Sequence, residues 1–271
     1  MTAATLSGRT IVMSGGSRGI GLAIALRAAA DGANLVLLAK TDQPHPRLEG
    51  TVHTAVEQIE AAGGRGVAVV GDVRNDDDIA RAVERAVETF GGIDIVVNNA
   101  SVLAPVGTLE LSPSRYDLMQ DVNVRGAFML TRACLPHLLA SDDPRILTLS
   151  PPLNLSPHWL GRFPGYMLAK YGMTLATLGF AAEFPQVAAN TLWPRTLIAT
   201  AAIGNTLGEP ALARSRDPRI VADAAHLILT SPPRSGLTLI DDEVLADAGV
   251  TDLSGYSHVP GAGLQSDVFL D

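Results

Sequence analysis

Short apolar runs alternate with longer alanine-rich stretches along most of the chain, and this alternation restricts the possible folds more than any other feature. The runs lack strict apolar–polar alternation, as expected of parallel strands buried on both faces. The predicted strands are Thr10–Ser14, Leu35–Ala39, Val67–Val70, Ile93–Asn98, Ile146–Ser150, Val187–Trp193 and Leu237–Ile240. The predicted helices are Gly19–Asp31, Val52–Ala62, Asp78–Phe90, Arg115–Leu139, Tyr166–Phe184 and Ile220–Thr230. Such a chain pairs its strands through right-handed crossovers, so we expect a single doubly wound α/β domain with a mostly parallel seven-stranded sheet.

The chain divides into one long domain and a short terminal segment. With 271 residues, of which 47% are hydrophobic, it can bury a large core, and we expect one domain over residues 1–250. Residues 251–271 are rich in Gly, Ser and Asp and have no periodicity, so they form either an extended arm or a disordered tail. Residues 197–217 are expected to form a short helix placed as a lid.

The composition argues against several classes of function. The 20 Lys and Arg residues and 28 Asp and Glu residues give a formal net charge of −8, which argues against nucleic-acid binding. A single cysteine, Cys134, rules out an internal disulfide and favours a reducing, cytoplasmic location. No apolar run reaches the roughly 18 residues that span a bilayer, and Met1–Gly8 does not have the pattern of a secretory signal. The six histidines are scattered, so no metal site is expected.

The first predicted strand leads directly into a glycine-rich loop, Ser14–Gly21, inside which a helix begins. Glycines allow the backbone to turn tightly beside a pyrophosphate, and the N–H groups at a helix N-terminus attract its charge. In this context the loop predicts a dinucleotide site in a Rossmann fold, with a tight turn that binds no ligand as the alternative. The loop residues expected to bind the cofactor are Gly15, Ser17, Arg18, Gly19, Ile20 and Gly21.

The residues that follow the second predicted strand indicate which dinucleotide is bound. NAD sites usually place an acid about 20 residues beyond the loop, where it holds the ribose hydroxyls. Here the strand ends in Ala39, and Lys40 follows at the place where a 2′-phosphate would lie, while Arg18 adds a second cation. Asp42 offers the alternative, because it can take the acidic role if the strand ends later. The two cations, weighed against the single alternative acid, favour NADP(H) over NAD(H).

Tyr166 and Lys170 lie four residues apart at the start of a predicted helix, so they share one face. A phenol with a pKa of about 10 exchanges protons poorly at neutral pH. A lysine ammonium about 4 Å away would contribute roughly 4 kcal/mol at an effective dielectric constant of 20. That energy corresponds to about three pKa units, so the pair predicts a tyrosine that titrates near physiological pH and serves as a catalytic acid or base.

Five motifs together resemble, in order and spacing, those of the short-chain dehydrogenase/reductase family over roughly residues 8–250. They are the loop Ser14–Gly21, Asp72-Val73, Asn98-Asn99-Ala100-Ser101, Asn123-Val124-Arg125-Gly126, and Tyr166 with Lys170. Further segments resemble its hydroxysteroid dehydrogenase-like branch, namely Lys40-Thr41, Pro44-His45-Pro46, Ser150–Leu155 and Trp193–Thr196. Some members of this branch carry an added C-terminal sterol-carrier domain. Because the sequence ends at Asp271, we expect that domain to be missing here.

The resemblance implies a role for each matching residue. Tyr166 is the implied proton donor or acceptor, Lys170 the residue that binds the nicotinamide ribose and lowers the tyrosine pKa, and Asn123 the holder of a water in a proton relay. Asp72 and Val73 are the implied adenine contacts. The other residues expected to bind the cofactor are Asn98, Asn99, Ala100, Pro194 and Thr196, together with Tyr166 and Lys170 themselves.

The sequence departs from the family pattern at two positions. The fifth strand of the family usually ends in Ser-Ser, and the second serine polarises the substrate carbonyl, whereas here Ser150 is followed by Pro151, which has neither hydroxyl nor N–H. Ser150 or the amide of Asn154 can take over this role, and the sequence does not distinguish them. After the sixth strand the usual Pro-Gly is replaced by Pro194-Arg195, where the arginine either reaches an anionic group or is solvated.

These observations favour an NADP(H)-dependent oxidoreductase that moves a hydride between nicotinamide and a carbonyl or secondary alcohol. The alternative is an NADP-binding protein of the same fold with little turnover, which acts as a sensor or partner. The residues expected to line an apolar substrate pocket are Leu153, Leu155, Trp159, Leu160, Phe163 and Leu197. The helices at 115–139 and 166–184 carry more apolar positions than one sheet-facing stripe needs, so a second layer is expected to cover them. The family resemblance implies that such helices pair across a two-fold axis, which gives a homodimer or homotetramer. A monomer whose terminal segment folds back over these helices is the alternative.

Overall fold

The computed structural model describes residues 5–44 and 49–271, and over these ranges seven strands form one sheet in the order β3-β2-β1-β4-β5-β6-β7. All of its neighbouring strands run parallel, so the predicted doubly wound fold is confirmed. The strands are β1 (Thr10–Ser14), β2 (Asn34–Ala39), β3 (Arg65–Val70), β4 (Ile95–Asn98), β5 (Arg145–Leu149), β6 (Ala188–Trp193) and β7 (Thr238–Ile240). His45 and Pro46 of the Pro44-His45-Pro46 motif lie outside the described residues.

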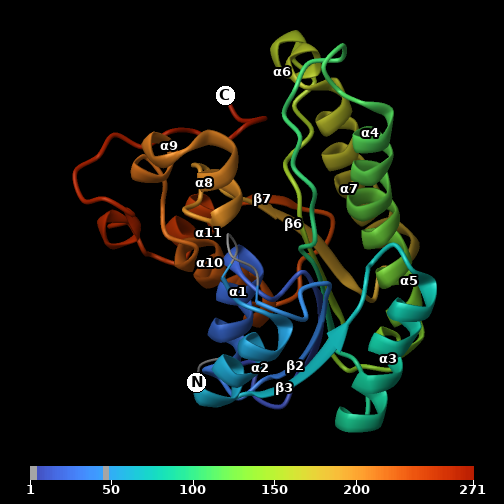
Figure 1. The fold of residues 1–271 in the computed structure, drawn as a ribbon. Coiled ribbons are helices and arrows are strands. Elements are labelled where there is room, and N and C mark those ends of the chain that lie inside the picture. Colours follow the sequence, from blue (N-terminus) through green and yellow to red (C-terminus); the bar gives the residue numbers. More distant parts are fainter. Residues whose placement is uncertain (1–4, 45–48) are drawn as a thin grey trace.

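Helices cover both faces of the sheet, as Figure 1 shows, with α1, α2 and α10 on one face and α3, α5 and α7 on the other. Their bounds are α1 (Gly19–Ala29), α2 (Val52–Ala61), α3 (Asp76–Phe90), α5 (Gly126–Leu138), α7 (Pro164–Glu183) and α10 (Arg219–Thr230). Strand β1 shows why continuous apolar runs suit this arrangement. Ile11 and Met13 pack in the core on the α1 side, and Val12 packs in the core on the α3 side.

The predicted helix Arg115–Leu139 is a continuous helical segment in the structure, but it changes from α to π and back. It consists of α4 (Pro113–Met119), a π-helical turn η1 (Gln120–Arg125) and α5, which follows without a gap. A π turn widens the helix and shifts the side chains that follow it, and such turns are frequent at functional sites. Here the π turn holds Asn123, which is fully buried. The π turn therefore includes one of the residues singled out from the sequence.

The order of the strands reverses between β1 and β4, which lie side by side although β2 and β3 separate them in the chain. In open parallel sheets, ligands bind outside the carboxyl ends of the strands at such a switch point. The glycine loop follows β1 directly, and Asn98, the last residue of β4, is followed by Asn99 and Ala100. Two motifs that are distant in the sequence therefore meet at one edge of the sheet.

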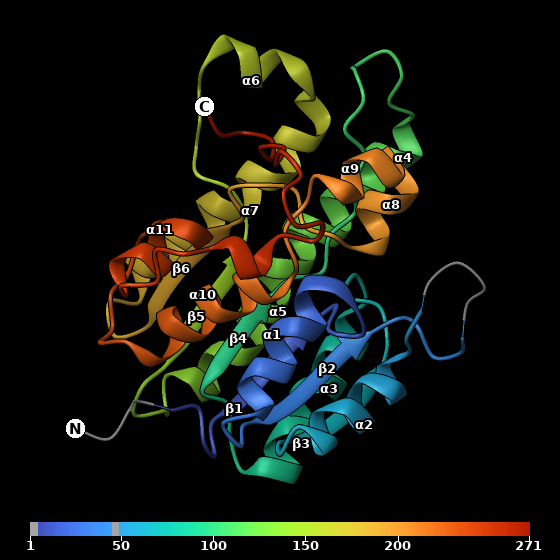
Figure 2. The same ribbon diagram turned by 90° about the vertical axis from the view of Figure 1, so that its left-hand side faces the viewer.

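Segments beyond the regular alternation gather above this edge. Residues 197–217 contain two short helices, α8 (Ala201–Leu207) and α9 (Glu209–Ala213), rather than one, and α6 (Pro157–Arg162) precedes α7. After β7 come α11 (Asp241–Asp247) and the short turn η2 (Ser254–Tyr256). Residues 251–271, here named the C-terminal arm, run from η2 past α9 to end beside α6 and α7 (Figure 2). Within the described residues, no helix has both the length and the apolar character needed to cross a membrane.

Candidate active site

The glycine loop forms a tight cradle between β1 and α1. Gly15 and Gly19 have φ angles of +74° and +57°, which favour glycine. A Cβ atom on Gly21 would lie 2.4 Å from Nδ2 of Asn99 and 2.7 Å from the carbonyl oxygen of Gly15. The Asn99 side chain in turn donates hydrogen bonds to the carbonyls of Ser14 and Gly15, at 3.2 and 2.9 Å. The Asn99 side chain therefore fixes the backbone of the loop through these two hydrogen bonds. The residues present fit a site for a pyrophosphate.

The residues beside the cradle are buried and closely packed. Asn98 donates from Nδ2 to the hydroxyls of Thr131 and Thr148, at 2.9 and 3.3 Å, which ties β4 to α5 and β5. The backbone N–H of Ala100 donates to Ser14 Oγ at 3.2 Å. Val73 is buried against the start of α5. The structure thus brings Asn98, Ala100 and Val73 to the same edge of the sheet as the loop.

Lys40 and Asp72 form an ion pair at the carboxyl ends of β2 and β3, with 3.1 Å between Nζ and Oδ2. Hydrogen bonds from the Arg74 guanidinium, followed by those from the Arg74 backbone and Lys40, hold the pKa of Asp72 well below its usual value despite its partial burial. The Lys40 side chain is 64% exposed, so its ammonium is also open to a further anion. Asp42, the alternative acid, is instead bound to His53 at 2.8 Å.

Arg18, the second predicted cation, donates to the carbonyls of Glu49 and Gly50, at 3.1 and 2.7 Å. Its guanidinium is thereby tied to the segment just before α2 (Val52–Ala61) and held beside the loop. Ser17 is buried in the same loop. Ile20, at the start of α1, packs against the core on the face of the sheet that α1, α2 and α10 cover.

Tyr166 and Lys170 lie on the same face of α7, as predicted. Both are buried, and the electrostatic prediction made for them is wrong for this structure. The Lys170 ammonium donates to the carbonyl of Leu149 at 2.9 Å and lies 5.1 Å above the ring of Trp193. Burial lowers the pKa of Lys170 to about 7. Burial raises the pKa of Tyr166 well above its usual value, and the charge of Asp267 adds to this rise. The phenol is therefore kept protonated in this structure.

Asn123 and Ser150 are fixed in different ways near this pair. Asn123 accepts from the backbone N–H of Val102 at 2.7 Å and donates back to its carbonyl at 3.2 Å, and the π turn that carries it packs against α7. Ser150 is fully buried, and its hydroxyl donates to the carbonyl of Lys170 at 2.7 Å and contacts that of Thr174. Ser150 therefore braces the start of α7 in this structure.

Asn154, the other candidate for the serine's role, has its amide groups engaged. Its backbone N–H donates to the hydroxyl of Tyr171 at 3.1 Å, and that hydroxyl donates back to the Asn154 carbonyl at 2.7 Å. Its side chain donates to the carboxylate of Asp271 at 2.9 Å. The segment around Asn154 is thus joined to both α7 and the end of the C-terminal arm.

The segment after β6 is joined to the C-terminal arm and to α11. Arg195, whose role the sequence left open, forms ion pairs with Asp242 and Glu243. Thr196 is buried and forms an antiparallel bridge with Ser266 of the arm. Arg195 thus pairs with acids of the protein itself, and the Pro194–Thr196 segment supports the arm.

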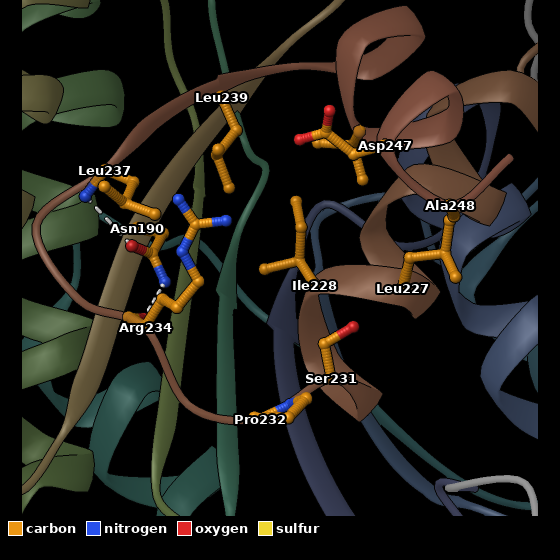
Figure 3. A pocket seen from close by; sticks show the side chains of 11 residues that line it. Asn190, Leu227, Ile228, Ser231, Pro232, Arg234, Leu237, Leu239, Asp247 and Ala248 are labelled. Atoms are coloured by element: carbon orange, nitrogen blue, oxygen red, sulfur yellow. Dashed lines mark hydrogen bonds between the residues drawn. The ribbon is translucent and has the colours of Figure 1, made fainter.

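The pocket in Figure 3 lies elsewhere and is not part of this site. It is a cavity of about 180 Å³ between α10, β7 and α11, and Asn190, Arg234 and Leu237 lie along one side of it. Asn190 stands midway along β6, and Leu237 precedes β7. The predicted cofactor and catalytic residues lie beyond the carboxyl ends of the strands and take no part in this lining.

Comparison with known proteins agrees with this geometry. The family model for short chain dehydrogenase matches residues 9–204. The chain belongs to the short-chain dehydrogenase family. It is 48% identical over 268 residues to Hydroxysteroid dehydrogenase-like protein 2 of Danio rerio, which confirms the resemblance to that branch. That alignment covers 98% of this chain but only 65% of the relative, so the chain spans less than two thirds of the relative's length.

Two solved structures extend the comparison. The first is the crystal structure of a protein from Xanthomonas campestris described as a putative dehydrogenase, whose sequence is 56% identical to this one. The two structures superpose with a TM-score of 0.96, and the match covers 98% of this chain and 99% of that one. A short chain dehydrogenase from Mycobacterium paratuberculosis, solved bound to NAD, is 24% identical with a TM-score of 0.73, covering 87% of this chain and 97% of that one. At that identity the second structure shows a shared fold alone.

Sequence reasoning missed the part that the C-terminal arm plays at this site. Asp267 lies close enough to Lys170 and Tyr166 for its charge to act on both, and burial raises its own pKa to about 7. Phe269 is 1% exposed and packs against Tyr166. Within the arm, only the isolated Val268-Phe269-Leu270 signalled a buried contact, and it has no periodicity that would indicate what it packs against.

Proposed function

We propose that this short-chain dehydrogenase is an NADP(H)-dependent oxidoreductase acting on the carbonyl or secondary alcohol of an apolar small molecule. The observation that carries the proposal is the buried Tyr166–Lys170 pair on α7, with Lys170 at the carboxyl ends of β5 and β6, on the same edge of the sheet as the glycine loop. A phenol and an amine that share a helix face at this place suit proton transfer to or from a substrate oxygen. Asn123, fixed on the π turn that packs against α7, is the third member of this group.

The cofactor would supply or accept a hydride at the substrate carbon, and the chain's own residues would handle binding and the proton. Gly15, Gly19 and Gly21 would leave room for the pyrophosphate, with Asn99 fixing the loop. Tyr166 would give a proton to the substrate oxygen or remove one from it. Lys170 would hold the nicotinamide ribose, and its charge would favour the ionised phenol. In this structure the lysine ammonium is turned to the carbonyl of Leu149, so that role requires it to exchange this partner.

The preference for NADP(H) over NAD(H) rests on the charges after β2. Lys40 and Arg18 are both cations held at the edge of the cradle, and Lys40 is largely exposed. The acid nearest to Lys40 in the chain, Asp42, is paired with His53, and Asp72 is held by Arg74 and Lys40. A 2′-phosphate would meet cations here, whereas Asp42 and Asp72, the acids available to the ribose hydroxyls of NAD(H), already have partners.

Cofactor titration together with a turnover screen tests the function. NADPH and NADH are titrated by fluorescence, and each is then combined with a panel of aldehydes, ketones and alcohols. We expect tighter binding of NADPH and turnover that disappears in Tyr166→Phe. Binding without turnover on the whole panel would favour the alternative, a nucleotide-binding protein with little activity. Tighter binding of NADH would overturn the cofactor assignment alone.

We also propose that the protein is a homodimer or homotetramer in the cytoplasm. Large apolar side chains are exposed on α5 and α7, with Phe128 44% exposed, Leu168 51% and Leu175 57%. The C-terminal arm contacts α7 at Tyr166 and Tyr171 and leaves these three exposed. If two copies pair about a two-fold axis, the same apolar patch of each subunit is buried against that of the other. Light scattering should give a particle above the chain mass of 28.3 kDa, and Leu175→Glu should reduce it.

A further inference from the structure

The end of the C-terminal arm fills an aromatic box at the catalytic tyrosine. The box consists of Trp159 from α6 and Tyr166 and Tyr171 from α7, and the ring of Phe269 lies among them. Its centroid is 5.2 Å from that of Tyr171, 5.8 Å from Trp159 and 5.9 Å from Tyr166. These are ordinary separations for aromatic pairs. The box therefore fits one ring of about the size of a phenyl group, and Phe269 supplies it here.

The arm closes the site to any other molecule. Tyr166 is 4% exposed and its ring is stacked on that of Phe269 at an interplanar angle of 28°. A tyrosine that exchanges a proton with a substrate oxygen must touch the substrate, so Phe269 and a bound substrate exclude each other at this position. Figure 2 shows the same relation in the ribbon, where the arm passes in front of α7 to its end beside α6.

Hydrogen bonds and the packing of Phe269 together hold the end of the arm, and a ring bound in the box would replace that packing. Asp267 donates its backbone N–H to the carbonyl of Arg195 at 3.0 Å, and Trp193 donates from Nε1 to the carbonyl of Val268 at 3.1 Å. Asp271 accepts from Nε1 of Trp159 at 3.0 Å. Phe269 itself has a φ of +71°, the only positive φ at a non-glycine among the described residues. Such strain occurs at clamps and switch segments, where the surroundings force it.

The walls of the box do not all depend on the arm. Tyr171 is fixed by its two hydrogen bonds to the backbone of Asn154, and Tyr166 stands on the long helix α7. Trp159 donates its indole N–H to the arm's Asp271. Two walls would therefore stay in place when the arm leaves, and the third would only have to find a new acceptor.

We propose that the aromatic box is the subsite for a flat, apolar ring of the substrate, of phenyl size, and that Phe269 occupies it until the substrate displaces the arm. The inference rests on the proposed function in naming the ligand a substrate, and it deepens that function by giving the substrate's class. A ring-bearing ketone or secondary alcohol would place its ring in the box and its oxygen at Tyr166. Phe269 acts as an internal competitor that raises the apparent Kd for such a ligand.

Acetophenone, whose ring equals that of phenylalanine, is the probe. Its binding is followed by saturation-transfer NMR on the full chain without cofactor, and its reduction by NADPH is followed by absorbance. The variants are Phe269→Ala, a chain ending at Gln265 in case Phe269→Ala does not fold, and Phe269→Ala with Trp159→Ala. Val259→Ala, an exposed position on the same arm, is the matched control.

We expect Phe269→Ala and the shortened chain to bind acetophenone about tenfold or more tightly than the wild type, with a matching fall in KM. Removal of Trp159 should cancel the gain, and Val259→Ala should change nothing. Equal binding by the wild type and both arm variants would overturn the proposal, as would a gain that survives the loss of Trp159. Tighter binding that Trp159→Ala cancels would support the box whether or not acetophenone is reduced, whereas absence of turnover on the whole carbonyl and alcohol panel would refute the proposed oxidoreductase, so the two failures are distinguishable.

Discussion

Gly21→Ala tests whether the glycine loop is built as a cradle that Asn99 holds. The added methyl would lie 2.4 Å from Asn99 Nδ2 and 2.7 Å from the carbonyl oxygen of Gly15, both closer than real side chains come. Gly21 has no positive φ, so the effect is steric and the backbone conformation itself is allowed for alanine. Either Asn99 moves away or the loop opens. In both cases the two hydrogen bonds from Asn99 Nδ2 to Ser14 and Gly15 are lost or weakened.

The magnitude follows from these contacts. Overpacking a tight site costs about 1–3 kcal/mol. Each of the two lost hydrogen bonds costs about 0.5–1.5 kcal/mol. Because a shift that relieves the clash also breaks the bonds, these costs overlap, and we expect a loss of about 2–4 kcal/mol in the free energy of unfolding. For a chain of this size that lowers Tm by about 5–15 °C.

The assay combines thermal unfolding with cofactor titration. Gly92→Ala is the matched control, because it makes the same chemical change in a loop where an added Cβ meets nothing within 4 Å and φ is not positive. It should alter stability by no more than about 0.5 kcal/mol. Gly21→Ala should also weaken binding of both NADPH and NADH by at least about tenfold, since the pyrophosphate is common to both. If Gly21→Ala matched Gly92→Ala in both Tm and Kd, the loop would not be the cradle described.

Three further predictions concern single side chains. Tyr166→Phe should reduce kcat by several orders of magnitude and leave Tm and NADPH binding nearly unchanged, and more than about a tenth of the wild-type kcat would show that the phenol does not transfer the proton. Lys40→Ala should weaken NADPH binding about 10- to 150-fold while sparing NADH, because a charged hydrogen bond is worth about 1.5–3 kcal/mol, and equal losses for both would place Lys40 away from the 2′-phosphate. Asp31 is partly desolvated, which would raise its pKa, but hydrogen bonds from His226, the Leu6 N–H and Arg27 outweigh this and lower it. A lowered folded-state pKa gives stability that is present above the unfolded value of 3.8 and lost as pH falls through the folded value, so urea unfolding of Asp31→Asn should lose that part of the acid dependence.

The fold was predictable because its signals are local and repeated. The bounds of strand Thr10–Ser14 were predicted to the residue. All five of its residues are buried, and the glycine loop that follows fixes where the strand ends. The helix predicted over Arg115–Leu139 is present, but its π turn was not predicted, because a period of 3.6 and the wider π period differ too little over six residues to be read from apolar positions. Only the structure shows this turn, which carries Asn123 and its hydrogen bond with Val102.

The electrostatics of the site were not predictable, because burial is a property of the folded chain. The sequence places Lys170 four residues from Tyr166, and from that spacing alone the ammonium should lower the phenol's pKa. The structure gives the lysine another partner, Leu149, and covers the phenol with a segment about 100 residues further along the chain. Desolvation favours the neutral form of each group, so it lowers the pKa of Lys170 and raises that of Tyr166. For the tyrosine this is the opposite of the shift predicted from the sequence.

The raised pKa of Tyr166 connects the proposed proton transfer with the proposed displacement of the arm. The cover that keeps Tyr166 protonated is the same arm that brings Asp267 near it, so displacement of Phe269 would remove a negative charge and readmit solvent or ligand at one step. Loss of the Asp267 charge, and any solvent that enters, would lower the cost of ionising the phenol. An arm that leaves only when a ring enters the aromatic box would thus prepare Tyr166 for proton transfer at the moment a substrate arrives. Without the arm, the tyrosine should titrate at lower pH, and the Gln265-terminated chain should show this in the absorbance of the ionised phenol against a Tyr166→Phe background, whereas identical titration curves for the two lengths of chain would refute the link.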